Sequence, residues 1–245
     1  MTKYAELDIL KERLNEYRKN EHSKVTKALE IEYTYESNKI EGNTLTLQET
    51  ALVIEKGLTV GGKTLNEHLE VINHTQAIDY IKELAKVKNT ITERDILQIH
   101  SLILQGIDKP NAGTFRKVPV IISGAKHKPP QPFLIPKQME DLMLWYNENK
   151  ETLHPVELSA EMHERLVTIH PFIDGNGRTS RLLMNLILLQ NGYPIAILKG
   201  DDKSRLEYYN ALEVAQTEDN KKVFINLITE TIKETIERIL LIFEK

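Results

Sequence analysis

The sequence predicts a mostly α-helical single domain that carries one short β-hairpin. Apolar residues recur at three- and four-residue steps through most of the 245 residues, as they do on amphipathic helices. Helix start and stop signals recur between these stretches. Only residues 114–136 break the helical period. No repeat, low-complexity tract or Gly/Ser linker divides the chain, so one domain is favoured over two.

The first part of the chain predicts three helices. An amphipathic opening helix follows from the spacing of Leu7, Leu10, Leu14 and Tyr17. A second, polar helix over about 24–41 ends at Gly42, a residue type suited to a helix C-terminus. A third begins at a capping box formed by Thr46 and Glu49 and ends near Gly57.

The rest of the chain predicts further helices around one non-helical segment. Helices are expected over 64–88, over 92–106, up to His170, over 178–191, and along an apolar stripe from Ile225 to Phe243. The segment 114–136, called here the flap, is rich in β-branched residues and proline, which predicts a short β-hairpin. The helix over 178–191 is apolar on nearly every face, so we expect it at the centre of the domain.

Composition excludes several classes of function. The net charge of −4 argues against general affinity for nucleic acids or membrane surfaces, which needs an excess of basic residues. The chain has no cysteine, which excludes disulfides, thiol catalysis and cysteine-bound metals. Its N-terminus has no apolar signal segment, and its apolar runs are too short to cross a membrane. We therefore expect a cytoplasmic protein.

The densest set of chemical groups lies between His170 and Arg181. The histidine is followed by Asp174, by a Gly-Asn-Gly turn at 175–177, and by Arg178 and Arg181 at the start of the central helix. Arginines are unfavourable there, by roughly 0.3–1 kcal/mol each, because the helix dipole is positive at its N-terminus. Free backbone N–H groups of the same turn add positive potential. The segment therefore predicts a site for a di- or triphosphate. The alternative is that both arginines pair with carboxylates elsewhere.

Two side chains of this segment are candidates for chemistry. Pro171 ends the preceding helix, which places His170 at a helix-to-loop junction. A neutral imidazole there can accept a proton from an incoming hydroxyl group. Asp174 offers a hard oxygen ligand beside the expected phosphates, which suits Mg²⁺. The alternative role for Asp174 is to cap the helix, and Phe172 is expected to anchor the loop in the core.

These residues resemble the signature of the Fic-domain family. Residues 170–181 match that signature in full, and the segment from Gly113 to Pro130 resembles the hairpin on which members of the family dock their targets. The resemblance covers at least residues 95–215. It implies a mostly helical fold and an enzyme that transfers AMP from ATP-Mg²⁺ to a hydroxyl side chain of a target protein, releasing pyrophosphate.

Carried over residue by residue, the resemblance implies a role for each position of the signature. His170 is the general base for the attacking hydroxyl group, and Asp174 holds Mg²⁺. Arg181 lies nearest the γ-phosphate. The phosphate-binding residues that it implies are Gly175, Asn176, Gly177, Arg178 and Arg181.

A second resemblance concerns the residues from Ser37 to Gly42. They are similar to the inhibitory motif of the family, Ser/Thr-x-x-x-Glu-Gly/Asn. This implies that the helix over about 24–42 is inhibitory, and that Glu41 pairs with Arg181 and spoils the placement of the γ-phosphate. The helix dipoles disfavour an anion at the position of Glu41 and a cation at the position of Arg181, so each needs a partner. The alternative is that Glu41 is an ordinary exposed acid at a helix end.

The resemblance also implies how the chain is divided. Residues 1–60 are expected to hold the N-terminal helices, inhibitory helix included, packed on the core. Residues 61–245 are expected to hold the Fic catalytic core with its C-terminal helices. Many bacterial relatives add a winged-helix domain for DNA, but the last predicted helix ends at Lys245. We therefore expect no separate DNA-binding domain.

Further contacts are implied for the adenine and for the target. Paired tyrosines lie where the family packs the adenine, and the alternative for them is core packing. The residues expected at the adenine are Tyr208, Tyr209 and Asn210. The flap residues expected near nucleotide and target backbone are Ile122, Ser123, Gly124 and Ala125. The target protein is expected to dock around 115–130, by addition of a strand to the exposed edge.

Three hypotheses for the function follow. The first is an autoinhibited protein adenylyltransferase that uses ATP and Mg²⁺. The second keeps the fold and reverses the reaction, with Glu41 orienting a water in a deAMPylase or a bifunctional enzyme. The third is a non-catalytic nucleotide-binding interaction module, against which the intact His170 and Asp174 argue. We expect no nucleic-acid or membrane partner, and a homo-oligomer stays open.

Overall fold

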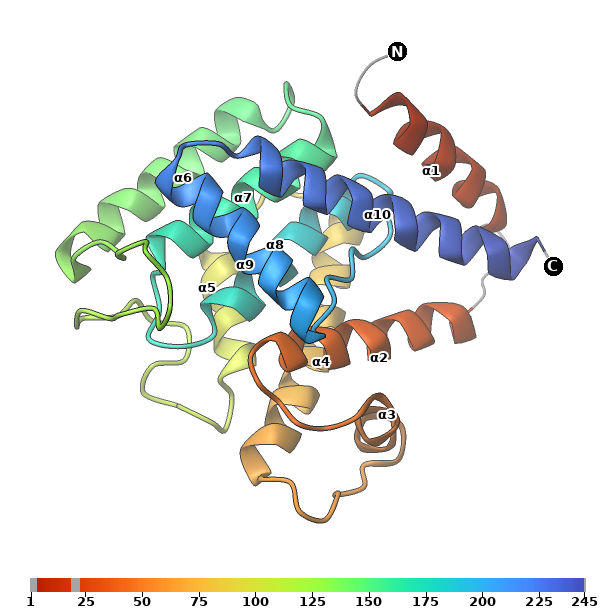
Figure 1. Ribbon diagram of the computed structural model, residues 1–245, viewed down its shortest axis with the longest axis horizontal. Helices are drawn as coiled ribbons and strands as arrows, with labels where there is room; N and C mark the ends of the chain where they lie inside the picture. Colours follow the sequence, from red (N-terminus) through yellow and green to blue (C-terminus); the bar gives the residue numbers. More distant parts are fainter. Residues whose placement is uncertain (1–3, 19–22, 245) are drawn as a thin grey trace.

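The computed structural model describes residues 4–18 and 23–244, which form helices and irregular connecting segments only. The prediction of an all-α architecture is therefore confirmed for this part of the chain. The elements, shown in Figure 1, are α1 (Ala5–Arg18), α2 (Ser23–Ile40), α3 (Leu47–Lys56), α4 (Leu65–Val87), α5 (Glu93–Ile103), η1 (Pro132–Leu134, a 3-10 helix), α6 (Ile135–Asn149), α7 (Pro155–Ile169), α8 (Asn176–Gln190), α9 (Asp202–Thr217) and α10 (Lys222–Phe243).

Helix α8 lies at the centre of the fold, as its sequence predicts. Its side chains are buried almost continuously from Asn176 to Leu188, and it packs against α4, α5 and α7. A helix that is apolar on all sides needs neighbours all round to remove that surface from water. The N-terminus of α8, with its backbone donors and arginines, is thereby fixed at the middle of the molecule.

Local sequence signals set several helix starts. The predicted capping box at Thr46 is present, and the same reciprocal hydrogen bonds occur at Thr64 and Thr92. In each, the threonine hydroxyl accepts from a backbone N–H three residues on, and the acid at that position accepts from the threonine N–H. These bonds satisfy donors that the first helical turn leaves unpaired.

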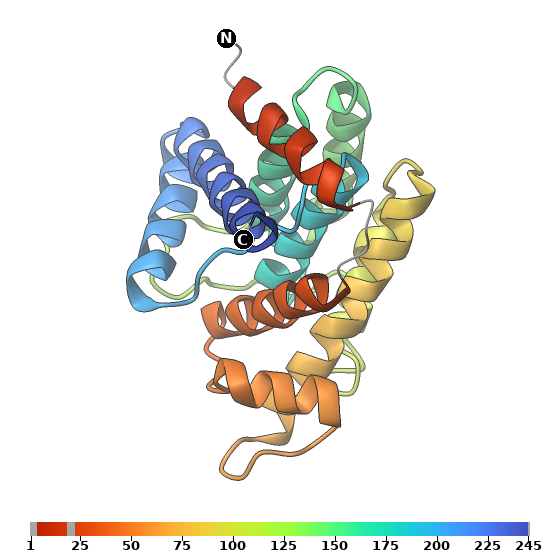
Figure 2. The same ribbon diagram turned by 90° about the vertical axis from the view of Figure 1, so that its right-hand side faces the viewer.

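The N-terminal helices cover two sides of the central bundle. Helix α1 packs on α10, and α2 packs on α4 and α8, with α3 against α2 and α4. Figure 2 shows α2 and α3 together at one end of the molecule and α1 beside α10. The expected division at residue 60 stays a prediction, and residues 1–3, 19–22 and 245 of its two ranges lie outside the described residues.

The expected β-hairpin of the flap is not formed as a β-ladder within the described chain. The segment is extended and irregular, with a turn closed by a hydrogen bond from Ala125 N to Ile122 O at 3.2 Å. Pro119, Pro129 and Pro130 carry no N–H to donate, which explains why β-branched residues alone do not build paired strands here. The last residues of the flap form η1 and the start of α6.

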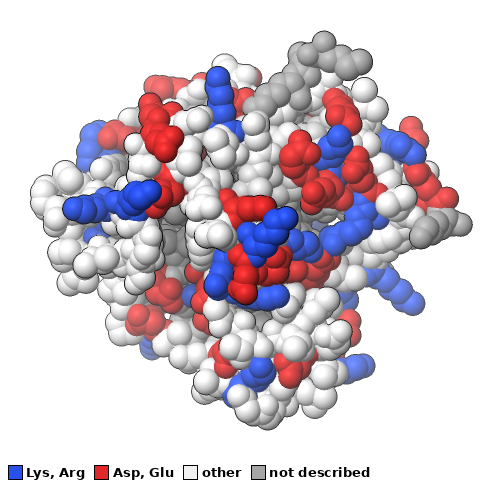
Figure 3. Space-filling view, in the orientation of Figure 1, with Lys and Arg blue, Asp and Glu red and all other residues white. Residues whose placement is uncertain are grey.

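The surface charge and the helix hydropathy of the described residues are those expected from the near-neutral composition and the short apolar runs. Acidic and basic side chains are intermingled on the face drawn in Figure 3, rather than gathered by sign. No helix within the described ranges is long and apolar enough to span a bilayer.

Candidate active site

The candidate site is built on the loop between α7 and α8. Helix α7 ends at Ile169, and His170 adopts the left-handed conformation, with φ 49° and ψ 58°. Its N–H still bonds to Leu166 O at 3.0 Å, and Pro171 then prevents further helix. Histidine enters the left-handed region more readily than most residues, although it remains uncommon there. The chain thus turns sharply at the predicted base.

The loop is braced from within by Asn176. Its Oδ1 accepts from Phe172 N at 3.0 Å, and its Nδ2 donates to Phe172 O at 2.9 Å. The Phe172 ring is fully buried, as expected for an anchor. The side chain of Asn176 is therefore engaged inside the loop, which leaves its backbone as the group that can face a phosphate.

His100 on α5 is a site residue that sequence reasoning missed. Its Nδ1 accepts from Gly113 N at 3.0 Å, so Nε2 carries the proton and donates to Asp174 O at 3.0 Å. Its ring stacks on Phe172 with centroids 3.6 Å apart. Burial lowers the pKa of His100 to about 4, so the ring is neutral. A histidine on the apolar face of a helix gives no sequence signal for this role.

The N-terminus of α8 lacks a side-chain cap. The cap position is Gly175, with φ 77°, and no side chain bonds to the first turn from it. Asp174 is therefore not the N-cap; its Oδ1 accepts from Gly175 N at 2.6 Å and its Oδ2 from Arg178 at 3.1 Å. The Asp174 side chain is 62% exposed, which leaves its carboxylate available to a cation.

Arg178 is buried behind this turn. Its guanidinium pairs with Asp174 and, at 3.2 Å, with Glu70 on α4. Glu70 also accepts from Asn43 Nδ2 at 2.8 Å. Within the described chain, the buried Nε of Arg178 has no hydrogen-bond partner. A buried donor without an acceptor is unfavourable, so the Arg178 guanidinium is incompletely satisfied in this structure.

Arg181, only 1% exposed, joins α8 to α2. Its Nε donates to Ser37 Oγ at 3.0 Å, and its Nη2 donates to Ser37 O at 2.9 Å and to Glu41 Oε1 at 2.7 Å. Burial opposes the charge, but the Glu41 carboxylate outweighs it, so the pKa of Arg181 lies above its ordinary value. This is the contact that the second resemblance implies, and both signature arginines have carboxylate partners.

Glu41 lies directly over the first turn of α8. A Cβ atom built at Gly177 would stand 2.3 Å from Glu41 Oε1 and 3.0 Å from Arg181 Nη1. Only glycine at 177 therefore allows the carboxylate to come this close. Helix α2 ends at Ile40, and Gly42, with φ 98°, lies in the turn that follows. The anion that occupies the positive end of α8 in this structure is Glu41 itself.

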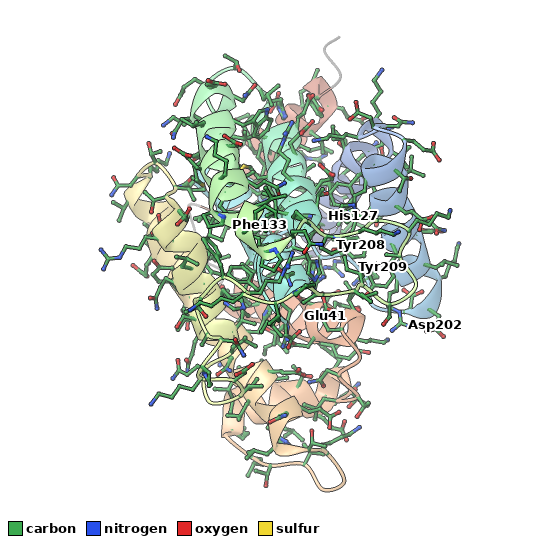
Figure 4. All side chains as sticks on the ribbon, turned by 90° about the vertical axis from the view of Figure 1, so that its left-hand side faces the viewer. Glu41, His127, Phe133, Asp202, Tyr208 and Tyr209 are labelled. Atoms are coloured by element: carbon green, nitrogen blue, oxygen red, sulfur yellow. The ribbon has the colours of Figure 1, made fainter. Side chains whose placement is uncertain are left out.

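The two predicted adenine tyrosines lie in different environments. Tyr208 is buried, and its hydroxyl lies 3.1 Å from His163 Nε2 and 3.5 Å from Arg181 Nη1. This matches the alternative of core packing. Tyr209 is exposed, and its hydroxyl donates to Ile40 O at 3.2 Å; Asn210 is exposed as well. Figure 4 shows Glu41 in the same region as both tyrosines.

The flap lies near the site without pairing to a sheet. The turn at 122–125 is mostly exposed. His127 Nε2 is 2.8 Å from Thr168 O on α7, and Lys126 Nζ is 2.7 Å from Glu213 Oε1 on α9. These contacts attach the flap to α7, which ends just before His170, and to α9.

The electrostatics favour a neutral His170. Burial lowers its pKa to about 4, and the nearby Arg116 and His127 add to the effect. A neutral imidazole can accept a proton at pH 7. Among the described residues, no group of three or more histidine or acidic side chains is arranged to hold a metal on its own.

The described part of the chain is an all-helical domain. At the uncapped N-terminus of α8 it brings together a neutral histidine, an exposed carboxylate and two buried arginines, an arrangement suited to an anion. Comparison with known proteins identifies the family. The profile of the Fic/DOC family matches residues 90–188. A solved fragment of Fic-1 from C. elegans is 31% identical, with a TM-score of 0.82, and the match covers 96% of this chain and 72% of that one. This chain belongs to the Fic/DOC family.

Two further relatives extend the comparison. A glutamate-to-glycine variant of the same C. elegans fragment has a TM-score of 0.83 at 32% identity, covering 95% of this chain and 69% of that one. A Drosophila grimshawi protein named protein adenylyltransferase Fic is 39% identical over 208 residues, which is 84% of this chain. The chain spans 42% of the length of that relative.

Proposed function

We propose that this chain is an autoinhibited protein adenylyltransferase. It transfers AMP from ATP to a hydroxyl side chain of a target protein, with release of pyrophosphate. The relatives named protein adenylyltransferase Fic support the reaction. The observation that carries the autoinhibition is the Glu41 carboxylate, which pairs with Arg181 at 2.7 Å over the N-terminus of α8, where a phosphate would bind.

The residues divide the chemistry in the following way. Neutral His170 accepts the proton of the target hydroxyl, and the hydroxyl oxygen forms a bond to the α-phosphorus of ATP. The bond from that phosphorus to the β-phosphate bridging oxygen breaks, and pyrophosphate leaves. Backbone N–H groups of 176–178, together with Arg178 and Arg181, neutralise the phosphate charges, because phosphoryl-type transfer needs positioning and charge neutralisation above all. The N–H of Gly175 is already bonded to Asp174 Oδ1.

Asp174 is the residue that would hold Mg²⁺. Its carboxylate is exposed and hard, and it stands beside the backbone donors of α8. Mg²⁺ is usually held by one or two carboxylates together with phosphate oxygens and waters, so a single aspartate fits. When bound, the ion neutralises phosphate charge.

Glu41 inhibits by occupying the place of an anion. Arg181 already has a carboxylate partner, and the carboxylate stands within van der Waals reach of the Gly177 backbone. An ATP γ-phosphate cannot share that space, and it is repelled by the negative charge. ATP bound with its γ-phosphate displaced would present the α-phosphate out of line with the target hydroxyl.

The remaining proposals concern partners and place. The target docks at the flap around 115–130, and cytoplasmic location and oligomeric state stay predictions.

The alternative reaction, removal of AMP by a water that Glu41 orients, uses the same residues. The 32% exposure of the Glu41 side chain is compatible with access of water to it.

The test uses Glu41→Gly, which removes the inhibitory carboxylate. Purified Glu41→Gly protein is incubated with cell lysate and with ATP labelled at either the α- or the γ-phosphate. We expect protein labelling from the α-label only, and none with Glu41→Gly/His170→Ala. Labelling from the γ-phosphate would indicate phosphorylation and contradict the proposal. No labelling despite measurable ATP binding would support a non-catalytic module, and release of AMP from pre-modified protein by wild type would support the reverse reaction.

A further inference from the structure

Arg116, at the start of the flap, is a buried arginine outside the phosphate site whose guanidinium makes three hydrogen bonds. It is 2% exposed, and its Nε donates to the carbonyl oxygen of His170 at 2.8 Å. Its own backbone N–H donates to Pro171 O at 2.9 Å. Side chain and backbone of one residue thus hold two successive carbonyls of the catalytic loop.

The other two nitrogens of the same guanidinium hold the flap. Nη1 donates to Val118 O at 3.1 Å, and Nη2 donates to Pro130 O at 2.7 Å. Val118 and Pro130 lie on the two arms of the flap, on either side of its exposed turn. A planar guanidinium with donors in a fixed fork can join three carbonyls in this way, whereas a lysine ammonium offers no such geometry.

Arg116 forms no ion pair within the described chain; carbonyl oxygens are its partners. Burial lowers the pKa of Arg116, because moving a cation out of water is unfavourable. A buried charge without a counter-charge is unfavourable for stability unless hydrogen bonds compensate it. Its arrangement therefore points to a role in holding the loop geometry.

His170 is a residue that needs such support. Its backbone is left-handed without being glycine, a conformation that costs on the order of 1–3 kcal/mol and persists only where the surroundings enforce it. Among the described residues, the buried Nδ1 of its ring has no hydrogen-bond partner, although the Val167 carbonyl favours the protonated ring. Within the described ranges, no carboxylate is hydrogen-bonded to this imidazole, as one is in a catalytic triad. The direction of the ring therefore depends on the His170 backbone and on the Val167 carbonyl.

We propose that Arg116 is a positioning residue that fixes the His170 carbonyl, and through it the imidazole, to both arms of the target-docking flap. The proposal rests on the function proposed above, since it assigns Arg116 to the general base of that reaction. A target seated on the flap would tighten the arms against the guanidinium and so hold His170 in its reactive direction.

The test compares Arg116→Met and Arg116→Lys in the Glu41→Gly background. Arg165→Met is the matched control, because Arg165 lies on α7, pairs with Glu161 and packs on the Trp145 ring. We expect kcat for AMP transfer to fall about 100-fold in both Arg116 variants, as for a misplaced catalytic group. ATP affinity is expected to stay within about twofold of the parent, since Arg116 does not line the phosphate turn, and Arg165→Met should transfer AMP like the parent.

A titration separates positioning from a merely structural role. The titratable and charged groups that face His170 are Arg116 and His127 from the flap and Glu41 from α2. The pKa of the His170 ring, followed by NMR and assigned by its loss in His170→Gln, should rise by about one unit in Arg116→Met and by less in Arg116→Lys, which keeps the cation. The acid limb of the kcat/KM profile should move with it.

Two results would overturn the proposal. One is a folded Arg116→Lys protein with kcat within about threefold of its parent. The other is an unchanged His170 titration in Arg116→Met. If Arg116→Met does not fold, Arg116→Lys decides by its kcat. Failure of the function itself is distinguishable, because the Glu41→Gly parent would then be inactive while the His170 titration still reports on Arg116.

Discussion

At the scale of single residues, the state of the site depends on which anion pairs with the buried guanidinium of Arg181. Arg181 is almost fully buried, and its carboxylate partner is Glu41. Removing one member of a buried pair is destabilising, because the remaining charge is left without compensation in a poorly solvated place. Without Glu41, Arg181 and the backbone donors of α8 form an anion site with no anion. The inhibitory contact and the proposed γ-phosphate contact therefore exclude one another.

This exclusion predicts how nucleotide changes stability. Glu41→Gly should lower the free energy of unfolding by about 1–3 kcal/mol without ligand, the contribution of a hydrogen bond to a charged group. Saturating ATP should then raise Tm by several degrees more in Glu41→Gly than in wild type, because ligand binding stabilises the folded state. Thermal unfolding with and without ATP is the measurement. Glu41→Gln, which keeps the size without the charge, should lie between the two. Equal ATP-induced shifts in wild type and Glu41→Gly would contradict this prediction.

A second residue-scale prediction concerns the buried His163. Its Nε2 faces the Tyr208 hydroxyl, and its ring packs on Phe224 with centroids 4.9 Å apart. Burial, and then the charge of Arg181, hold its pKa well below 6.5. Below pH 6.5, His163 is protonated in the unfolded chain but stays neutral in the folded chain. Its contribution to the free energy of unfolding is therefore complete above pH 6.5 and decreases as the pH falls below that value.

Urea unfolding at pH 7.5 and pH 5.5 checks this sign. The slope from one such histidine is at most about 1.4 kcal/mol per pH unit. We expect wild type to lose more stability between the two pH values than His163→Gln, whose side chain does not titrate. Parallel losses in the two proteins would show that His163 does not carry this pH dependence.

At the scale of elements, α2 is docked on the core through buried apolar side chains such as Tyr33 and Ile40 and through polar contacts. Glu32 pairs with Lys199 and with Arg238 of α10, and Glu36 accepts from Gly200 N at 2.8 Å. Gly200 lies against the helix so closely that an added Cβ would stand 2.9 Å from Lys39 Cβ and 3.0 Å from Glu36 O. Since those atoms include helix backbone, either α2 or the segment that carries Gly200 must shift if residue 200 gains a side chain.

Gly200→Ala should therefore displace α2 from its packed position on the core. With Glu41 intact, AMP transfer should rise roughly fivefold or more over wild type, at the lower end of typical coupling between sites, while remaining below that of Glu41→Gly. Initial rates of labelling by each purified protein measure it. Gly61→Ala is the control, since a Cβ there meets nothing within 4 Å. Wild-type rates in Gly200→Ala would indicate that the position of α2 does not set the inhibition.

Some elements could be predicted from the sequence, and the flap could not. The capping boxes and the all-round apolar helix were predictable because they depend on neighbouring residues. The irregular structure of the flap was not predictable, because its prolines remove ladder donors and its path depends on distant groups such as Pro171 and Thr168. Capping by Glu67 and Asp95 follows the same local rule at two further helices.

At the scale of the whole molecule, the site joins residues that are far apart in the chain. Glu41 and Arg181 are separated by 140 positions, and Arg178 and Glu70 by more than a hundred. The fold brings them together because α2 and α4 both pack on α8. Helix dipoles indicated that Glu41 and Arg181 each need a partner, but only the family resemblance joined them. No local pattern indicated Glu70, His100 or His163, whose roles depend on packing alone.

The central claim is that Glu41 holds this chain inactive by occupying the anion site of α8. The most direct measurement is the initial rate of AMP transfer from ATP labelled at the α-phosphate, for wild type and Glu41→Gly side by side at saturating ATP, each with its His170→Ala counterpart. The account predicts a rate roughly 5- to 150-fold higher in Glu41→Gly that vanishes with His170→Ala. Equal rates for wild type and Glu41→Gly, or labelling that survives His170→Ala, would contradict it.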